Sequence, residues 1–193
     1  KVTSEDKHDY IEDYKKYDSI IASNKITTNM DLEYTPISNV LLTGFTGFLG
    51  AHVLDSFIKN ETGNIYCLIR NKDNFTAEQR LKNVLHFYFG NSYDYLIGKR
   101  IHLVEGDITL DNLGLSDEDY RNLGNKLTTV IHCAALVKHY GNYSAFKEIN
   151  IDGTKRIVDL CEEFNLRLLH VSTISISGNN LAEGANIENY FGK

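Results

Sequence analysis

Short, nearly continuous apolar runs alternate with amphipathic stretches from Asn39 onward. Five runs are typical of strands buried on both faces: 40–43, 65–69, 101–104, 129–132 and 167–172. Apolar residues recur at helical spacing over three longer stretches: 48–58, 77–89 and 143–164. Regular strand–helix alternation predicts a parallel sheet covered on both faces, so the expected fold is a doubly wound α/β domain.

The first 38 residues differ from the rest of the chain. They are polar, charged and rich in tyrosine, with one helix predicted over 10–23. We interpret 1–38 as a lead-in linker and 39–193 as the α/β domain. The chain begins at Lys1 without a methionine, and we expect it to be part of a longer protein.

Composition and charge narrow the function classes. Hydrophobic residues make up 42% of the chain, enough for a core and too many for a disordered segment. A net charge of −6, without a cluster of basic residues, argues against nucleic acid as a partner. No apolar run is long enough to cross a bilayer. The three cysteines match no metal-binding or redox spacing, so we expect no metal site and reduced, buried thiols in a cytoplasmic protein.

A glycine-rich turn follows the first predicted strand and opens the first predicted helix. Gly44 allows the tight turn, Gly47 lets the backbone approach a pyrophosphate, and Gly50 lets the helix pack close to the sheet. The helix N-terminus then offers N–H groups to phosphates. A plain glycine-rich turn is the alternative, but the strand and helix around it favour a dinucleotide site in a Rossmann-type domain. The candidate residues are Gly44, Thr46, Gly47, Phe48, Leu49 and Gly50.

Two arginines predict which dinucleotide binds. Arg70 ends the second strand, where an acidic residue would hold the ribose 2′-hydroxyl of NAD. A guanidinium there pairs instead with a 2′-phosphate, so we predict NADPH. Arg80 is a second candidate phosphate ligand, and a solvated helix charge is its alternative role.

Two further loops follow the third and fourth strands. Asp107 could accept a hydrogen bond from the adenine amino group while Ile108 packs on the ring, although an aspartate that caps a turn is the alternative. Ala134 and Ala135 are small enough to let the cofactor lie close. We interpret His132 as a packed histidine rather than a catalyst.

Four motifs in chain order carry a family resemblance: the glycine turn 44–50, the segment 131–135, the segment 150–154 and the segment 171–175. With them the chain resembles the extended short-chain dehydrogenase/reductase superfamily. Within that superfamily, 40–50 and 67–70 are most similar to the terminal thioester reductase domains of nonribosomal peptide synthetases, which are related to carboxylic acid and aminoadipate reductases.

The resemblance implies an enzyme that uses NADPH to release an acyl or peptidyl thioester from a phosphopantetheinyl carrier protein as an aldehyde. The lead-in 1–38 would then connect to a preceding carrier domain. Thr173 matches the family's hydroxyl residue, which would steady the charge on the carbonyl oxygen. Asn150 matches an asparagine near the active-site end of its helix, and we count it among the cofactor-binding residues.

The family's Tyr-x-x-x-Lys pair is the main departure. It would follow the strand that ends near Thr173, where only Tyr190 occurs, with Lys193 three residues later. Two correctly spaced pairs precede that strand, and we interpret neither as catalytic: Tyr95 with Lys99, and Tyr143 with Lys147. We expect the pair and the substrate-binding lobe to lie beyond Lys193, and this chain to bind cofactor with little or no turnover. The alternatives are a fatty acyl reductase, a sugar-nucleotide epimerase or dehydratase, or a non-catalytic regulator that senses NADP.

Overall fold

A computed structural model describes residues 37–72, 74–138 and 140–173, together with Lys15. Its five strands are β1 (Val40–Thr43), β2 (Ile65–Ile69), β3 (Ile101–Glu105), β4 (Thr129–His132) and β5 (Arg167–His170). They form one parallel sheet in the order β3-β2-β1-β4-β5. The predicted Rossmann-type architecture is confirmed over this part of the chain.

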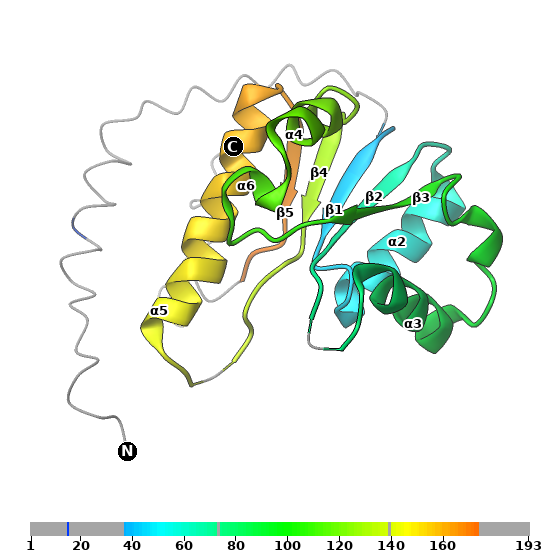
Figure 1. The fold of residues 1–193 in the computed structure, drawn as a ribbon, viewed down its shortest axis with the longest axis horizontal. Helices are drawn as coiled ribbons and strands as arrows, with labels where there is room; N and C mark the ends of the chain where they lie inside the picture. Colours follow the sequence, from blue (N-terminus) through cyan, green and yellow to red (C-terminus); the bar gives the residue numbers. More distant parts are fainter. Residues whose placement is uncertain (1–14, 16–36, 73, 139, 174–193) are drawn as a thin grey trace, which may run out of the picture.

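Helices cover both faces of the sheet (Figure 1). The helices are α2 (Phe48–Asn60), α3 (Ala77–Phe89), α4 (Asp117–Gly124), α5 (Tyr143–Phe146) and α6 (Gly153–Glu163). The other helical turns among the described residues are η1 (Asp94–Leu96), η2 (Asp111–Gly114) and η3 (Lys147–Asp152). Figure 1 places α2 and α3 on one face, and α4 and α6 on the other.

Alternate residues of β1 point into two separate cores. Val40 and Leu42 belong to the cluster that includes residues of α2 and α3, whereas Leu41 packs with residues of α4 and α6. All three side chains are fully buried. Residues 40–42 are therefore apolar at consecutive positions, because both faces of the strand are covered, and the strand ends in the buried but polar Thr43.

Several boundaries differ from the sequence-based expectation. The predicted helix over 143–164 is divided into α5, the π-helical turn η3 and α6, and β5 ends at His170 rather than at residue 172. The sequence did not predict α4, whose eight residues are mostly polar. The predicted helix over 10–23 lies outside the described residues, except for Lys15.

The structure tests two earlier expectations: that the cysteines are buried, reduced side chains, and that no segment is long and apolar enough to cross a bilayer. All three cysteines are free; Cys67 and Cys161 are buried in the two cores, as expected, whereas Cys133 is only partly buried and lines the cleft described below. Burial raises the pKa of the Cys161 thiol to about 11. Across the described part of the chain, every helix is too short or too polar to cross a membrane.

Candidate functional site

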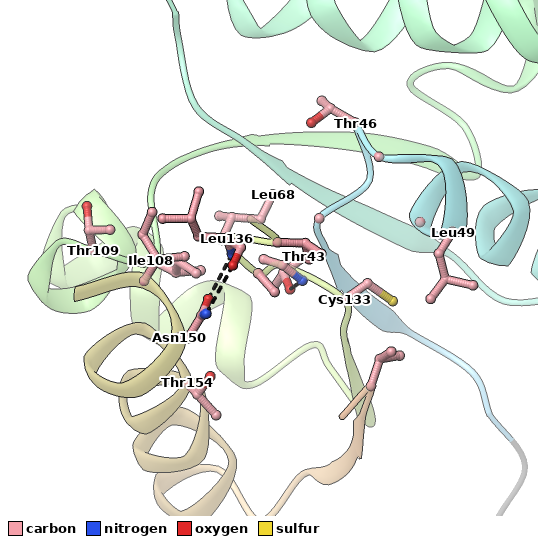
Figure 2. Close-up of a pocket in the computed structure, with 18 of the residues that line it drawn as sticks. Thr43, Thr46, Leu49, Leu68, Ile108, Thr109, Cys133, Leu136, Asn150 and Thr154 are labelled. Carbon is pink, nitrogen blue, oxygen red and sulfur yellow. Dashed lines mark hydrogen bonds between the residues drawn. The ribbon is translucent and has the colours of Figure 1, made fainter. Parts of the chain in front are cut away.

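A cleft of about 1070 Å³ lies at the carboxyl ends of the strands. In an open parallel sheet this is where ligands bind, between the strands at which the order reverses, here β1 and β4. Figure 2 shows side chains from the glycine turn, from the loops after β3 and β4, and from η3 and α6 around this cleft. All predicted site residues line it: Gly44, Thr46, Gly47, Phe48, Leu49, Gly50, Arg70, Arg80, Asp107, Ile108, Ala134, Ala135, Asn150 and Thr173.

The outer two glycines of the turn are required by the protein's own packing. Gly44 has a φ of +72°, and a Cβ there would lie 2.6 Å from the backbone nitrogen of Ala134. A Cβ on Gly50 would lie 2.3 Å from the carbonyl oxygen of Gly44. Gly44 therefore lets the turn approach the segment that follows β4, and Gly50 lets the start of α2 approach the turn.

Gly47 is different, because packing alone does not require a glycine there. Its backbone is extended, with φ −89°, and a Cβ would meet only the Gly44 carbonyl, at an ordinary 3.5 Å. Gly47 is also the N-cap of α2, without a side-chain cap and with no acidic residue in the first helical turn. This end of the helix therefore keeps uncapped N–H groups and a positive dipole end, and the missing Cβ leaves space beside them for an anionic ligand such as a pyrophosphate.

Positive charge gathers on the β2 side of the cleft. The guanidinium of Arg80 donates to the backbone carbonyl of Arg70, and its other terminal nitrogen lies 3.5 Å from the hydroxyl of Thr46. Arg80 thus joins the end of β2 to the glycine turn. The described charged residues that line the cleft are Arg70, Arg80, Lys138 and Asp107, three cations and one carboxylate in a chain of net charge −6.

Asp107 forms an ion pair across the cleft edge with Arg70. The Arg70 Nη1 atom donates to Asp107 Oδ2 at 3.1 Å, while Asp107 Oδ1 accepts from the backbone nitrogen of Thr109 at 2.9 Å and from its hydroxyl at 3.0 Å. Partial burial raises the pKa of Asp107, but the hydrogen bonds from Thr109 and Arg70 outweigh it and hold the pKa below its ordinary value. The turn-capping and ligand-facing interpretations of Asp107 are thus compatible, since Oδ2 retains acceptor capacity.

A fully buried histidine lies behind the cleft wall. His132 Nδ1 is 2.6 Å from the Thr43 hydroxyl, and His132 Nε2 is 3.1 Å from the Thr154 hydroxyl. The Thr43 oxygen also accepts the Ala134 N–H at 3.2 Å. We assign the tautomer in which the Thr43 hydroxyl donates to Nδ1 and Nε2–H donates to the Thr154 hydroxyl, so that the Thr43 hydroxyl both donates and accepts. Burial, with a smaller contribution from the stacked ring of His170, lowers the pKa of His132 to about 4. The neutral imidazole ties β1, β4 and α6 together.

Asn150 holds the loop that follows β4. Its side-chain oxygen accepts the Leu136 N–H at 2.7 Å, and its amide nitrogen donates to the Leu136 carbonyl at 3.2 Å (Figure 2). Asn150 lies in the π-helical turn η3. Both hydrogen bonds of the Asn150 side chain therefore hold the backbone of Leu136, which is part of the cleft wall.

Of the candidate catalytic residues that the structure describes, Thr173 lies at the cleft and the two Tyr-x-x-x-Lys pairs do not. Thr173 lines the cleft just beyond β5. Both correctly spaced Tyr-x-x-x-Lys pairs are among the described residues, and neither contributes to the cleft lining. Tyr190 and Lys193 lie outside the described residues. The structure brings Thr173 to the same cleft as the glycine turn.

Sequence reasoning missed the polar residues that support the site. The roles of Thr43, Thr109 and Thr154 emerge only from their hydrogen bonds to His132 and Asp107. Of the three, only Thr109 could have been found from the sequence, because a threonine two residues after an aspartate is a common partner for the carboxylate in a turn.

Comparison with known proteins identifies a family and several related enzymes. The family model described as male sterility protein matches residues 42–190. Fatty acyl-CoA reductase 1 of Homo sapiens is 31% identical over 151 residues, which cover 73% of this chain and 29% of the relative. The thiolation-reductase di-domain of an archaeal nonribosomal peptide synthetase has a TM-score of 0.68 and 37% identity over 81% of this chain and 33% of that chain. The terminal R domain of the myxalamid pathway has a TM-score of 0.65 and 32% identity over 75% of this chain and 37% of that chain.

The chain spans only part of each of these proteins. Its coverage is 29% of the human relative, 33% of the archaeal di-domain and 37% of the myxalamid R domain. The likeness therefore concerns about a third of each of these larger proteins.

Proposed function

Because the chain belongs to the male sterility protein family of NAD(P)-binding oxidoreductases, we propose that its cleft binds NADPH. The observation that carries the proposal is the ring of anion-binding groups at one cleft edge. Gly47 opens the uncapped end of α2, Arg80 lies beside the same turn, and Arg70 lines the cleft at the end of β2. Each of these features favours phosphate.

The other cleft residues fit the remaining parts of a dinucleotide. Asp107 Oδ2 can accept from an adenine amino group, with Ile108 beside it in the lining. On the opposite side, Ala134 and Ala135 leave room for a ribose, and Asn150 fixes the wall they belong to by holding Leu136. When bound, the nicotinamide would supply hydride.

We further propose that this is the cofactor-binding portion of a reductase that converts a carrier-bound acyl or peptidyl thioester into an aldehyde. In that reaction the thioester carbonyl carbon gains a hydride, its C–S bond breaks, and the released thiolate takes up a proton. Thr173 would donate a hydrogen bond to the carbonyl oxygen as negative charge develops there. Similarity to the archaeal thiolation-reductase di-domain and the myxalamid R domain supports this assignment, with a carrier protein as partner.

Calorimetric titration with NADPH and NADH tests the cofactor proposal. A charge-assisted pair between Arg70 and a 2′-phosphate is worth about 1.5–3 kcal/mol, so NADPH should bind about tenfold to a hundredfold more tightly. Arg70→Ala should abolish that preference. Arg121→Ala is the matched control, because this exposed arginine of α4 does not line the cleft. Equal affinities in the wild type would contradict the role of Arg70, and failure to bind either cofactor would contradict the proposal itself.

A fatty acyl-CoA reductase is the second candidate, favoured by the 31% identity to the human enzyme. The two candidates share the cofactor and differ in the thiol that leaves. The protein in its natural length, given one acyl group on CoA and on a phosphopantetheinylated carrier protein, would be assayed by the loss of NADPH absorbance. Turnover of the carrier-bound thioester alone supports the first candidate, and turnover of acyl-CoA alone supports the second. For the 193 residues themselves we expect little or no turnover.

A further inference from the structure

We infer that Asp107 sets the degree of cofactor discrimination, because it competes with the 2′-phosphate for the guanidinium of Arg70. The inference rests on the proposed function and assigns to Asp107 a role opposite to that of Arg70. Arg70 would create the preference for NADPH, and Asp107 would limit it.

The geometry of the pair supports competition. Arg70 Nη1 lies 3.1 Å from Asp107 Oδ2, and both residues line the cleft, so the guanidinium already has an anionic partner before any ligand arrives. A 2′-phosphate that pairs with Arg70 must displace this carboxylate or share the guanidinium with it. A dinucleotide that lacks the phosphate leaves the ion pair intact.

Asp107 is the fixed member of the pair. Its other oxygen accepts two hydrogen bonds from Thr109, and its backbone nitrogen donates to the carbonyl of Leu113 at 2.8 Å. The Asp107 side chain is 19% exposed, against 50% for that of Arg70. Movement of Asp107 away from Arg70 would break both hydrogen bonds to Thr109, so the carboxylate competes with the 2′-phosphate of NADPH for the guanidinium.

Replacing Asp107 with asparagine separates this role from adenine binding. The asparagine oxygen can still accept from Thr109, which places its amide group, now a donor, towards Arg70 and frees the guanidinium. Any hydrogen bond lost to the adenine amino group weakens NADPH and NADH equally, because both carry the same adenine. The ratio Kd(NADH)/Kd(NADPH) cancels that loss and reports only on the phosphate.

The experiment measures this ratio by calorimetric titration of the wild type and Asp107→Asn, with folding checked by circular dichroism. Since a half-exposed ion pair contributes about 0.2–1 kcal/mol, we expect the ratio to rise up to about fivefold in Asp107→Asn, even if both affinities fall. Asp111→Asn is the matched control. It removes the same charge from an exposed aspartate that pairs with Arg156 at 3.2 Å, outside the cleft lining, and should leave the ratio unchanged.

Three outcomes would overturn the inference. An unchanged ratio in Asp107→Asn would show that Arg70 is not held back, and a lower ratio would show that Asp107 orients Arg70 for the phosphate instead. An equal rise in an Arg70→Ala background would show direct repulsion of the phosphate rather than competition. These results differ from failure of the proposed function, in which the wild type binds neither cofactor or binds both equally.

Discussion

Replacement of His132 by asparagine should remove a specific pH dependence of stability. The imidazole is fully buried, with Nδ1 accepting from Thr43 and Nε2–H donating to Thr154. A proton on Nδ1 would place a positive charge on this fully buried ring and would force the Thr43 hydroxyl to turn its hydrogen away from that nitrogen. Asparagine retains an acceptor near the Nδ1 position and does not titrate.

The magnitude follows from the two pKa values of His132. In the unfolded chain the ordinary value is 6.5, and in the folded protein burial lowers the pKa to about 4. Between these values the unfolded state binds more protons, so the free energy of unfolding falls as the pH is lowered. At about 1.4 kcal/mol for each pKa unit the whole effect is about 3 kcal/mol, of which about 2 kcal/mol falls between pH 6.5 and about pH 5.

Urea denaturation at about pH 7.5 and about pH 5 measures the effect as a change in the free energy of unfolding. At the higher pH, His132→Asn should be less stable than the wild type by about 1–3 kcal/mol, because Thr154 loses its partner. At the lower pH the difference in free energy of unfolding between the two proteins should be smaller by about 2 kcal/mol, because only the wild type loses stability through protonation of His132 in the unfolded state.

His52→Asn is the control for this comparison. His52 lies on the exposed surface of α2, outside the buried network, so its replacement should preserve the wild-type pH dependence of stability. If the gap between the wild type and His132→Asn were the same at both pH values, the buried and neutral state assigned to His132 would be refuted.

Two further substitutions test the packing around the cleft. Gly44→Ala should lower stability by about 3 kcal/mol or more, because its Cβ would lie 2.6 Å from the backbone of Ala134. Gly98→Ala, also at positive φ but with nothing within 4 Å, should cost about 1 kcal/mol, and equal losses in thermal melts would contradict the packing argument. Asn150→Ala should cost about 1–3 kcal/mol by removing both hydrogen bonds to Leu136 and should weaken binding of both cofactors in titration. Unchanged affinity for both cofactors would show that the cleft wall at Leu136 keeps its position without Asn150.

The strands could be predicted from sequence because the sheet is covered on both faces. Burial on both sides favours apolar residues at consecutive positions, as in 40–42, and such a run indicates a strand when helical patterns flank it. The helix α4 could not be found in this way, because only Tyr120 and Leu123 among its residues are apolar. Its local signal was Ser116, the N-cap, whose hydroxyl accepts from the Asp119 N–H.

The candidate site could be predicted where its chemistry is local in sequence. The spacing of Gly44, Gly47 and Gly50 lies within seven residues, and its predicted position after a strand is confirmed. The contacts of His132 could not be predicted, because its partners lie 89 and 22 residues away in the chain. The Arg70–Asp107 ion pair is non-local in the same sense, since β2 and β3 bring together residues 37 apart.

The π-helical turn η3 has a consequence for the register of the chain. A π turn contains about one residue more than an α turn, and one residue corresponds to about 100° of rotation around a helix axis. Side chains before and after η3 therefore point in directions that a regular α-helix would not give them, and Asn150 lies within this turn. In an alignment with a relative whose helix is regular, this extra residue would appear as a single-residue insertion between 147 and 152. Such an insertion would mark the place where the helix turns a polar side chain towards the cleft wall.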